Sequence, residues 1–220
     1  CYDMFTNVDM EFPSVKKSDG SEGQLTNGNF CVYRESGDRA VREDAFEKFF
    51  GTYKKYINTF AATYGGSVKY DCFNAKVRGY SSACEAALSG GNVPVSVYDS
   101  LVKAIHDALP SMRRYLDIRR KAMGTDKIDM FDLYVPIVKE ADIPMPYADA
   151  KTLVKEALKP FGKRYGELLD RAYSEHWIDV YENKGKSSGA FSAGVYGVHP
   201  YVMLNYTDTL DDAFTLAHEL

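Results

Sequence analysis

The sequence lacks the long apolar runs and the strong charge imbalance that mark several common classes of protein. No stretch approaches the 18 or so consecutive apolar residues of a membrane span. The first residues, CYDMFTNVDMEF, lack the basic and then apolar pattern of a signal peptide. The 27 basic and 31 acidic residues give a net charge of −4, and the basic residues are scattered. We therefore expect no membrane and no nucleic acid among the partners, and a cytoplasmic location.

Cysteines are few, and none forms a C-x-x-C pair. Cys1, Cys31, Cys72 and Cys84 have irregular spacings in a chain of 220 residues, so we expect free, mostly structural thiols. The sequence also contains no G-x-S-x-G, no P-loop and no G-x-G-x-x-G after a predicted strand. These absences argue against serine hydrolases with a nucleophile elbow and against the common nucleotide-binding folds.

What is present is a mainly α-helical pattern with a small β element at each end. The turn-rich KKSDGSEG lies between two loosely alternating stretches, YDMFTNVDMEF and QLTNGNFCVYRE, and predicts a β-hairpin over 1–35. Over 36–220 the apolar residues recur mostly at helical spacing. Predicted helix boundaries include a stop at Gly65 and Gly66, a cap at Ser96, a start at Pro110, a stop at Gly124 and a bend at Pro160. We therefore divide the chain into a lead-in hairpin, 1–35, and a helical part, 36–220.

The last 35 residues differ from the rest of the chain in composition. KSSGAFSAGVYGVHPYVMLNY is rich in glycine, small residues and aromatics, and predicts two short strands joined near Gly197. A final helix follows, in which Thr209 and Asp212 form a capping box and Leu210, Ala213, Phe214 and Ala217 are expected to form a buried stripe.

The final helix carries His218 and Glu219 directly after this stripe, in TLAHEL. In an H-E-x-x-H helix, two histidines four residues apart ligate one Zn²⁺, and the glutamate serves as general base. Only the first half of that motif is present here. Taken alone, the pair is more typical of exposed polar residues at a helix end than of a metal site.

The surrounding residues decide between these interpretations. The stretch from Lys186 to the end closely resembles the segment that leads into the zinc helix of oligoendopeptidase F, a member of the thimet-oligopeptidase group of zinc peptidases. TNVDMEFPSV, LTNGNF, ESGDRAVREDAFEKFF, AKVRGYSSACEAALSGGNVPVSVYDSLV and WIDVYENKGK resemble that family in the same order. The resemblance covers essentially all 220 residues. One departure is Arg113 in RRYLDIRR, where the family pattern has histidine.

The resemblance implies a zincin-type oligopeptidase helical fold and a fragment that ends inside the H-E-x-x-H motif. It also implies a parent enzyme that cleaves internal bonds of short peptides with one zinc ion. In that enzyme His218 would be a metal ligand and Glu219 the catalytic base. Because a catalytic zinc needs three protein ligands, we expect this chain alone to be inactive and to bind no zinc. The missing N- and C-terminal parts of the parent chain would complete the site.

The glycine-rich stretch is the candidate for peptide binding. Its small residues leave backbone groups open to another extended chain, and the resemblance implies an edge strand along which the substrate lies. Close packing of the strand on a helix is the other use of such glycines. His199 precedes Pro200 between the two strands and is a further candidate for substrate contact. The predicted substrate-binding residues are Gly189, Ala190, Phe191, Ser192, Ala193, Gly194 and His199.

A second hypothesis is not enzymatic. The chain could be a helical scaffold that binds peptides or a partner through its exposed strand without hydrolysing them, and its apolar surface would then favour self-association. His106 and His176 do not lie at metal-ligand spacing, and Asp211 and Asp212 fit the stabilisation of the helix start.

Overall fold

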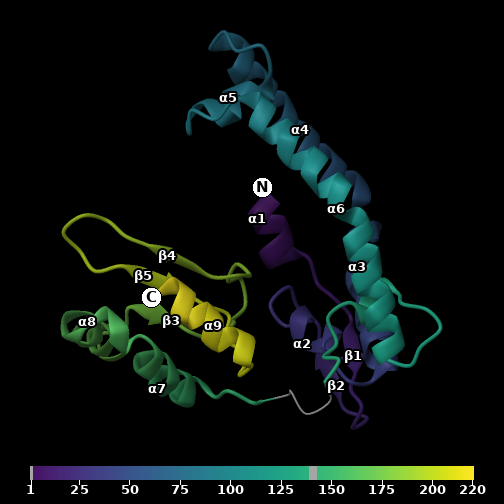
Figure 1. Cartoon of the computed structure of the whole chain (residues 1–220), viewed down its shortest axis with the longest axis vertical. Helices are drawn as coiled ribbons and strands as arrows, with labels where there is room; N and C mark the ends of the chain where they lie inside the picture. Colours follow the sequence, from purple (N-terminus) through teal and green to yellow (C-terminus); the bar gives the residue numbers. More distant parts are fainter. Residues whose placement is uncertain (1, 139–142) are drawn as a thin grey trace. The chain divides into compact units, whose positions relative to one another are not determined.

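The computed structural model describes residues 2–138 and 143–220. They are mainly α-helical, as predicted, and form two compact units (Figure 1). One unit comprises Thr52–Leu133 with Tyr2, and the other comprises Asp3–Gly51 and Tyr134–Leu220. These bounds differ from those of the lead-in hairpin, 1–35, and the helical part, 36–220. The division of the chain into those two parts stays a prediction. In the described part of the chain, no helix is both long and apolar enough to cross a bilayer.

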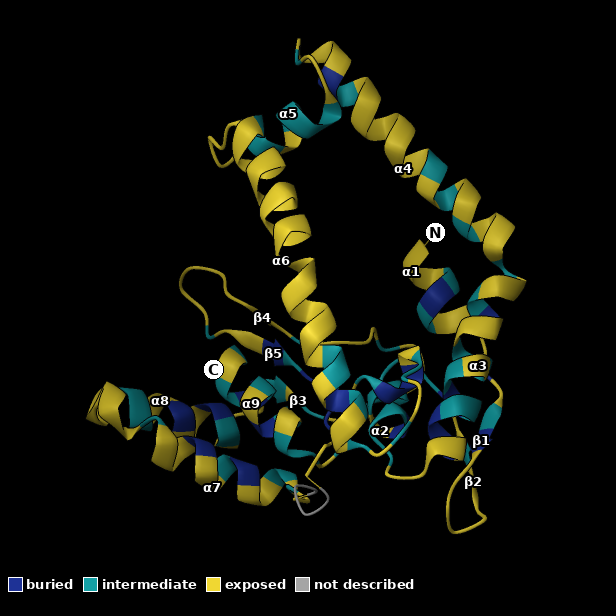
Figure 2. Cartoon of the chain, turned by 45° about the vertical axis from the view of Figure 1, so that its right-hand side comes forward, coloured by how far each residue is buried: buried dark blue, intermediate teal, exposed yellow. Residues whose placement is uncertain are grey.

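The first unit consists of helices. It contains α4 (Ile57–Val77), α5 (Ala83–Ser89), α6 (Val95–Ala122) and the 3-10 helix Met130–Asp132. Helix α5 contacts both α4 and α6. Its N-cap is Ser82, whose hydroxyl accepts a hydrogen bond from the Glu85 amide at 3.0 Å. Most of the surface of α4 and α6 is exposed (Figure 2).

Several predicted helix boundaries in this unit are wrong. Helix α4 runs through Gly65 and Gly66, neither of which has a positive φ. Helix α6 begins at Val95, which places Ser96 inside it rather than at its cap, and it continues through Pro110. Glycine and proline lower helix stability at one position but do not forbid a helix whose other residues favour it. The stop at Gly124 is confirmed, since α6 ends at Ala122 and Gly124 has a φ of 65°.

The second unit begins with several short elements and with most of α3, up to Gly51. Residues 2–9 are helical, as α1 (Tyr2–Met4) and a π-helical turn (Phe5–Asp9), and not the strand that their alternation predicts. The hairpin is present but shorter: β1 (Ser14–Lys16) pairs antiparallel with β2 (Glu22–Gln24). α2 (Phe30–Arg34) replaces the end of the second predicted strand, and α3 (Arg39–Lys55) follows. The rings of Phe12 and Phe30 each stack on Phe49 of α3.

The rest of the second unit carries the residues of interest. It contains α7 (Tyr147–Ala157), a 3-10 turn (Lys159–Phe161), α8 (Lys163–Ser174), β3 (Ile178–Asp179), β4 (Phe191–Ala193), β5 (Tyr201–Met203) and α9 (Leu210–Glu219). The bend predicted at Pro160 is confirmed, as are two strands joined near Gly197. Residues 178–179 form β3, which follows the end of α8 after a short turn.

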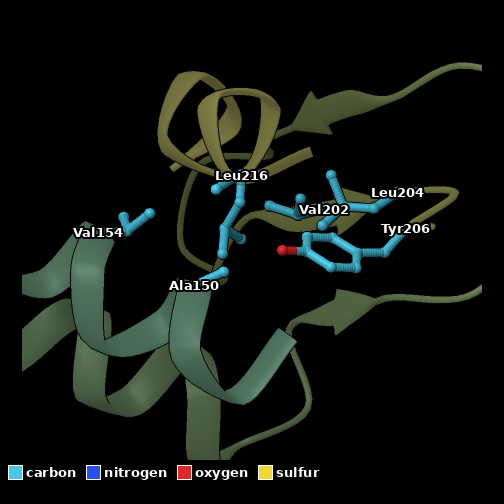
Figure 3. Close-up of a cluster of buried hydrophobic side chains, with 7 residues drawn as sticks. Ala150, Val154, Val202, Leu204, Tyr206 and Leu216 are labelled. Carbon is cyan, nitrogen blue, oxygen red and sulfur yellow. The ribbon is translucent and has the colours of Figure 1, made fainter. Parts of the chain in front are cut away.

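The three strands form one small sheet in the order β3-β5-β4. β3 is parallel to β5, and β4 is antiparallel to it. β4 is therefore an edge strand. One face of the sheet packs against α7 and α9, and the buried core there joins the three elements (Figure 3). The core residues are Ala150, Val154, Val202, Leu204, Tyr206, Ala213 and Leu216.

Candidate active site

Helix α9 is held at its start by a network of hydrogen bonds around one carboxylate. The Thr209 hydroxyl accepts from the Asp212 amide at 3.2 Å, and the Asp212 carboxylate accepts from the Thr209 amide at 3.0 Å, which is the predicted capping box. The same carboxylate also accepts from the amide and hydroxyl of Thr207, at 3.0 and 2.8 Å, and from the Thr209 hydroxyl at 2.7 Å. The direction of α9 is thereby fixed relative to β5.

The last turn of α9 places His218 and Glu219 in different surroundings. Ala213 and Leu216 are buried in the core, whereas Phe214, which the sequence places in the buried stripe, is exposed. His218 is exposed, whereas Glu219 is half-buried. Successive residues on a helix do not face each other, so Glu219 turns toward a cavity of about 430 Å³ and His218 is not among the residues that line it.

This cavity is mostly apolar and brings together side chains that are distant in the sequence. Leu168, Leu169 and Ala172 of α8 line one part of it, and Trp177, the loop from Gly197 to Pro200, and Val202 line another. Tyr165, Arg171, Glu219 and Leu220 also line it. The structure thus brings two predicted site residues, Glu219 and His199, to one cavity.

His199 belongs to a group of stacked rings. Its imidazole lies parallel to the Trp177 indole, with 4.8 Å between ring centroids and 3° between planes, and Tyr201 lies 4.5 Å away on a tilt. The Nδ1 atom of His199 is 2.8 Å from the Pro200 carbonyl oxygen, so the proton that this contact needs lies on Nδ1. The stacking and the contact with Pro200 fix the plane of the imidazole ring.

Two further residues extend this group, and sequence reasoning missed both. The Arg171 guanidinium lies 5.2 Å from the centre of the Trp177 indole and donates two hydrogen bonds to Glu175, at 2.8 and 3.0 Å. Glu175 also accepts from Trp177 Nε1 at 3.1 Å. These bonds, chiefly that with Arg171, lower the pKa of the Glu175 carboxyl. Arg171 and Glu175, four residues apart at the end of α8, have a spacing that suits an ion pair, but the sequence does not show that both contact Trp177.

The predicted peptide-binding stretch lies at and beside β4. Gly189 has a φ of 88° and precedes the strand. Ala190 packs against the core cluster, whereas Phe191, Ser192, Ala193 and Gly194 are exposed. These six residues are not among those that line the cavity beside Glu219.

The hydrogen bonds of β5 show which backbone groups of β4 are open. The amides of Val202 and Leu204 donate to Trp177 and Asp179, on the β3 side, at 2.8 Å each. Backbone groups alternate in direction along a strand, so Tyr201 and Met203 face β4 and pair with Ala193 and Phe191. The N–H and C=O of Ser192 then point away from the sheet. An edge strand with open groups of this kind is suited to pairing with another extended chain.

A complete metal site is not found in the part of the chain that the structure describes. No group of three or more His, Cys, Asp or Glu side chains there is placed to hold a metal ion. His218 is a suitable zinc donor on an exposed helix face, but one imidazole provides one of the ligands that a zinc site needs. The described residues therefore do not fit a whole zinc centre. Cys31, Cys72 and Cys84 are free thiols, and Cys1 lies outside the described residues.

Comparison with known proteins identifies the family. The model of peptidase family M3 matches residues 32–220. The chain belongs to peptidase family M3. It is 44% identical to oligopeptidase PepF of Bacillus subtilis (strain 168) over 218 residues, which are 99% of this chain and 32% of that protein. The chain spans about a third of the length of the curated relatives it matches.

Solved structures support this family assignment and the fold. The crystal structure of oligoendopeptidase-F from Enterococcus faecium is 39% identical, with a TM-score of 0.61, over 79% of this chain and 33% of the other. PZ peptidase A, crystallised with an inhibitor, has a TM-score of 0.78 at 22% identity over 99% of this chain and 38% of the other. That second likeness concerns the fold alone. The predicted fold class is thus confirmed for this M3 chain.

Proposed function

We propose that this M3 chain is part of a zinc-dependent oligoendopeptidase that hydrolyses internal bonds of short peptides. One juxtaposition carries the proposal. The edge strand β4, with the backbone groups of Ser192 open, belongs to a sheet that packs on the helix bearing His218 and Glu219. An extended peptide and a water-activating group are what peptide hydrolysis must bring together. A cytoplasmic location remains part of the proposal.

The residues of this chain would bind the substrate and hold a proton. A peptide paired with Ser192 would donate and accept main-chain hydrogen bonds, which are indifferent to its side chains. Glu219 would take the proton from the attacking water and return it to the leaving amine. His199, held in its plane by Trp177, is the candidate for contact with a substrate group that enters the cavity beside Glu219.

His218 would supply one zinc ligand, and the others would come from outside the described residues. Zinc makes water acidic enough to be deprotonated near neutral pH. The edge strand β4 suits a short, flexible peptide, because only an extended chain can pair with the open backbone groups of an edge strand.

Substitution of Glu219 in the whole protein tests the proposal. Glu219→Gln removes the base but keeps the shape of the side chain, so kcat for an internally cleaved peptide should fall by about two to four orders of magnitude. Zinc content and peptide KM should change little. His218→Ala should instead lower zinc content, measured by elemental analysis, together with kcat. Asp211→Asn, an exposed change on the same helix, is the matched control and should leave both unchanged.

Two results would count against the proposal. Unchanged kcat in Glu219→Gln would remove this residue from catalysis. A wild-type protein that binds peptides at β4 but cleaves none, and holds no zinc, would favour the alternative of a non-catalytic helical peptide-binding scaffold.

A further inference from the structure

The segment between β3 and β4 has no regular structure of its own, yet it must return the chain to the free edge of β5. Over residues 180–190 it contains turns and bends but no helix or strand. Two side chains, Lys186 and Asn205, make hydrogen bonds to backbone carbonyls in and beside this segment. We call these two residues the clamp.

Lys186 ties the segment to the end of β3. Its side chain is only 6% exposed, and its ammonium group donates to the carbonyl oxygens of Tyr181 at 2.8 Å and Asp179 at 3.2 Å. The Asp179 carboxylate lies 3.2 Å from the same nitrogen. Two carbonyl oxygens thus accept hydrogen bonds from this buried ammonium group, and a carboxylate pairs with its charge. Such a charge is retained in a buried place only when its donors are satisfied.

Asn205 ties the same segment to the end of β5. Its amide nitrogen donates to the Gly189 carbonyl at 2.8 Å and to the Ser187 carbonyl at 2.9 Å, 16 and 18 residues away in the sequence. Both amide protons are therefore in use. The Oδ1 atom of Asn205 is buried and has no hydrogen-bond partner among the described residues. The amide donors, and not the oxygen, hold the segment.

The clamp acts just where β4 begins. Gly189 has a positive φ of 88°, and its carbonyl is turned toward Asn205. Ala190 then packs against the core, and Phe191 pairs with Met203. The clamp holds residues 187–189, which lie directly N-terminal to β4. It thereby sets the register of β4 on β5, and this register directs the backbone groups of Ser192 outward. In strands, a slip of one residue would reverse these directions.

We infer that Asn205 and Lys186 are positioning residues that hold β4 in the register in which it binds the substrate backbone, an inference that rests on the proposed function. Neither residue need touch the peptide. Their contribution is to keep the edge strand ordered before a peptide arrives, which lowers the cost of binding.

Asn205→Asp in the whole protein is the sharpest test, because it keeps the shape of the side chain and replaces its two donors by an oxygen facing two carbonyls. Peptide KM should rise about tenfold, as expected for lost hydrogen bonds that order the strand, while kcat changes less than twofold. Asn183→Asp introduces the same charge at an exposed position of the same segment and should leave KM unchanged.

Hydrogen exchange gives a readout that needs no activity. In Asn205→Asp and in Lys186→Met, the amides of Phe191 and Ala193 should exchange at least about tenfold faster than in the wild type, while those of β5 and α9 keep their rates. Lys186→Met keeps the aliphatic length and serves if Asn205→Asp does not fold.

The outcomes separate the possible failures. A lower kcat at unchanged KM, with faster exchange throughout the unit, would mean that the clamp is merely structural and would overturn the inference. Unchanged exchange at β4 would overturn it as well. A wild-type protein that cleaves no peptide would instead contradict the proposed function, and the exchange comparison would still decide whether the clamp orders β4.

Discussion

At the scale of single residues, Asp212 does more than its position in the sequence suggests. The capping box with Thr209 is a local pattern and was predictable. The bonds to Thr207 are also local, but they require the bend at Asp208, which has a φ of 62°. One carboxylate therefore orders both the loop after β5 and the first turn of α9.

Replacement of this carboxylate should loosen the helix that carries the candidate site. We expect Asp212→Ala to lower the free energy of unfolding by roughly 1–2 kcal/mol, the usual cost of a lost cap. Asp211→Ala removes an exposed carboxylate from the same turn and should cost only a few tenths of a kcal/mol, through the helix dipole. Urea unfolding of the two variants at pH 7 measures both values. Equal losses would show that charge near the helix start matters and the capping bonds do not.

At the scale of elements, α4 tests how strongly glycine limits a helix. Gly65 and Gly66 lie in its interior with helical backbone, and a Cβ atom added to either would meet no atom within 4 Å. Alanine at each position should therefore stabilise the protein by about 0.5–1 kcal/mol. Gly79, just after α4, has a φ of 77°, and Gly79→Ala should be destabilising for that reason.

Thermal unfolding of these three variants provides the check. A rise in Tm for Gly65→Ala and Gly66→Ala, with a fall for Gly79→Ala, is the expected pattern. A fall for all three would mean that α4 needs the flexibility of its glycines, and that its interior is not the regular helix described above.

The same elements show which parts of the fold are readable from sequence. The α9 cap, the bend at Pro160 and the pair β4–β5 depend on neighbouring residues, and these were predicted. The continuation of α4 through Gly65 and Gly66, and of α6 through Pro110, was not predicted. A single glycine or proline lowers helix stability at its own position, but the remaining residues keep the helix formed. Alternating residues in 2–9 likewise predicted a strand where the chain forms short helical turns.

At the scale of the whole molecule, the candidate site depends on contacts that no local pattern reveals. The sequence supplied His218, Glu219 and the glycine-rich strand, the first two through a short motif and the third through composition. It did not indicate that Trp177 stacks on His199, or that Asn205 holds Gly189, because these pairs are far apart in the chain and meet only once β5 lies between β3 and β4. The motif indicates which residues could be catalytic, whereas the order of the strands shows which other residues hold their neighbours in place.

Metal binding also depends on the whole molecule, because the ligands of one ion come from different parts of the chain. A zinc centre needs several ligands, whereas the described residues bring His218 to an exposed helix face and hold no group of three candidate ligands. We therefore expect residues 1–220 alone to hold no stoichiometric zinc after dialysis and to cleave no peptide, and the whole protein to hold one zinc per chain and to be active. Elemental analysis and a peptide assay, run side by side on both, measure this.

Circular dichroism serves as the control for folding of the shorter chain, because an unfolded sample would lose any metal trivially. A folded chain of residues 1–220 that retained one zinc ion per molecule would contradict the prediction, and would mean that side chains beyond His218 within this sequence complete the site. Activity without zinc in the whole protein would contradict the metal chemistry itself, since Glu219 would then have to activate water that nothing else had made acidic.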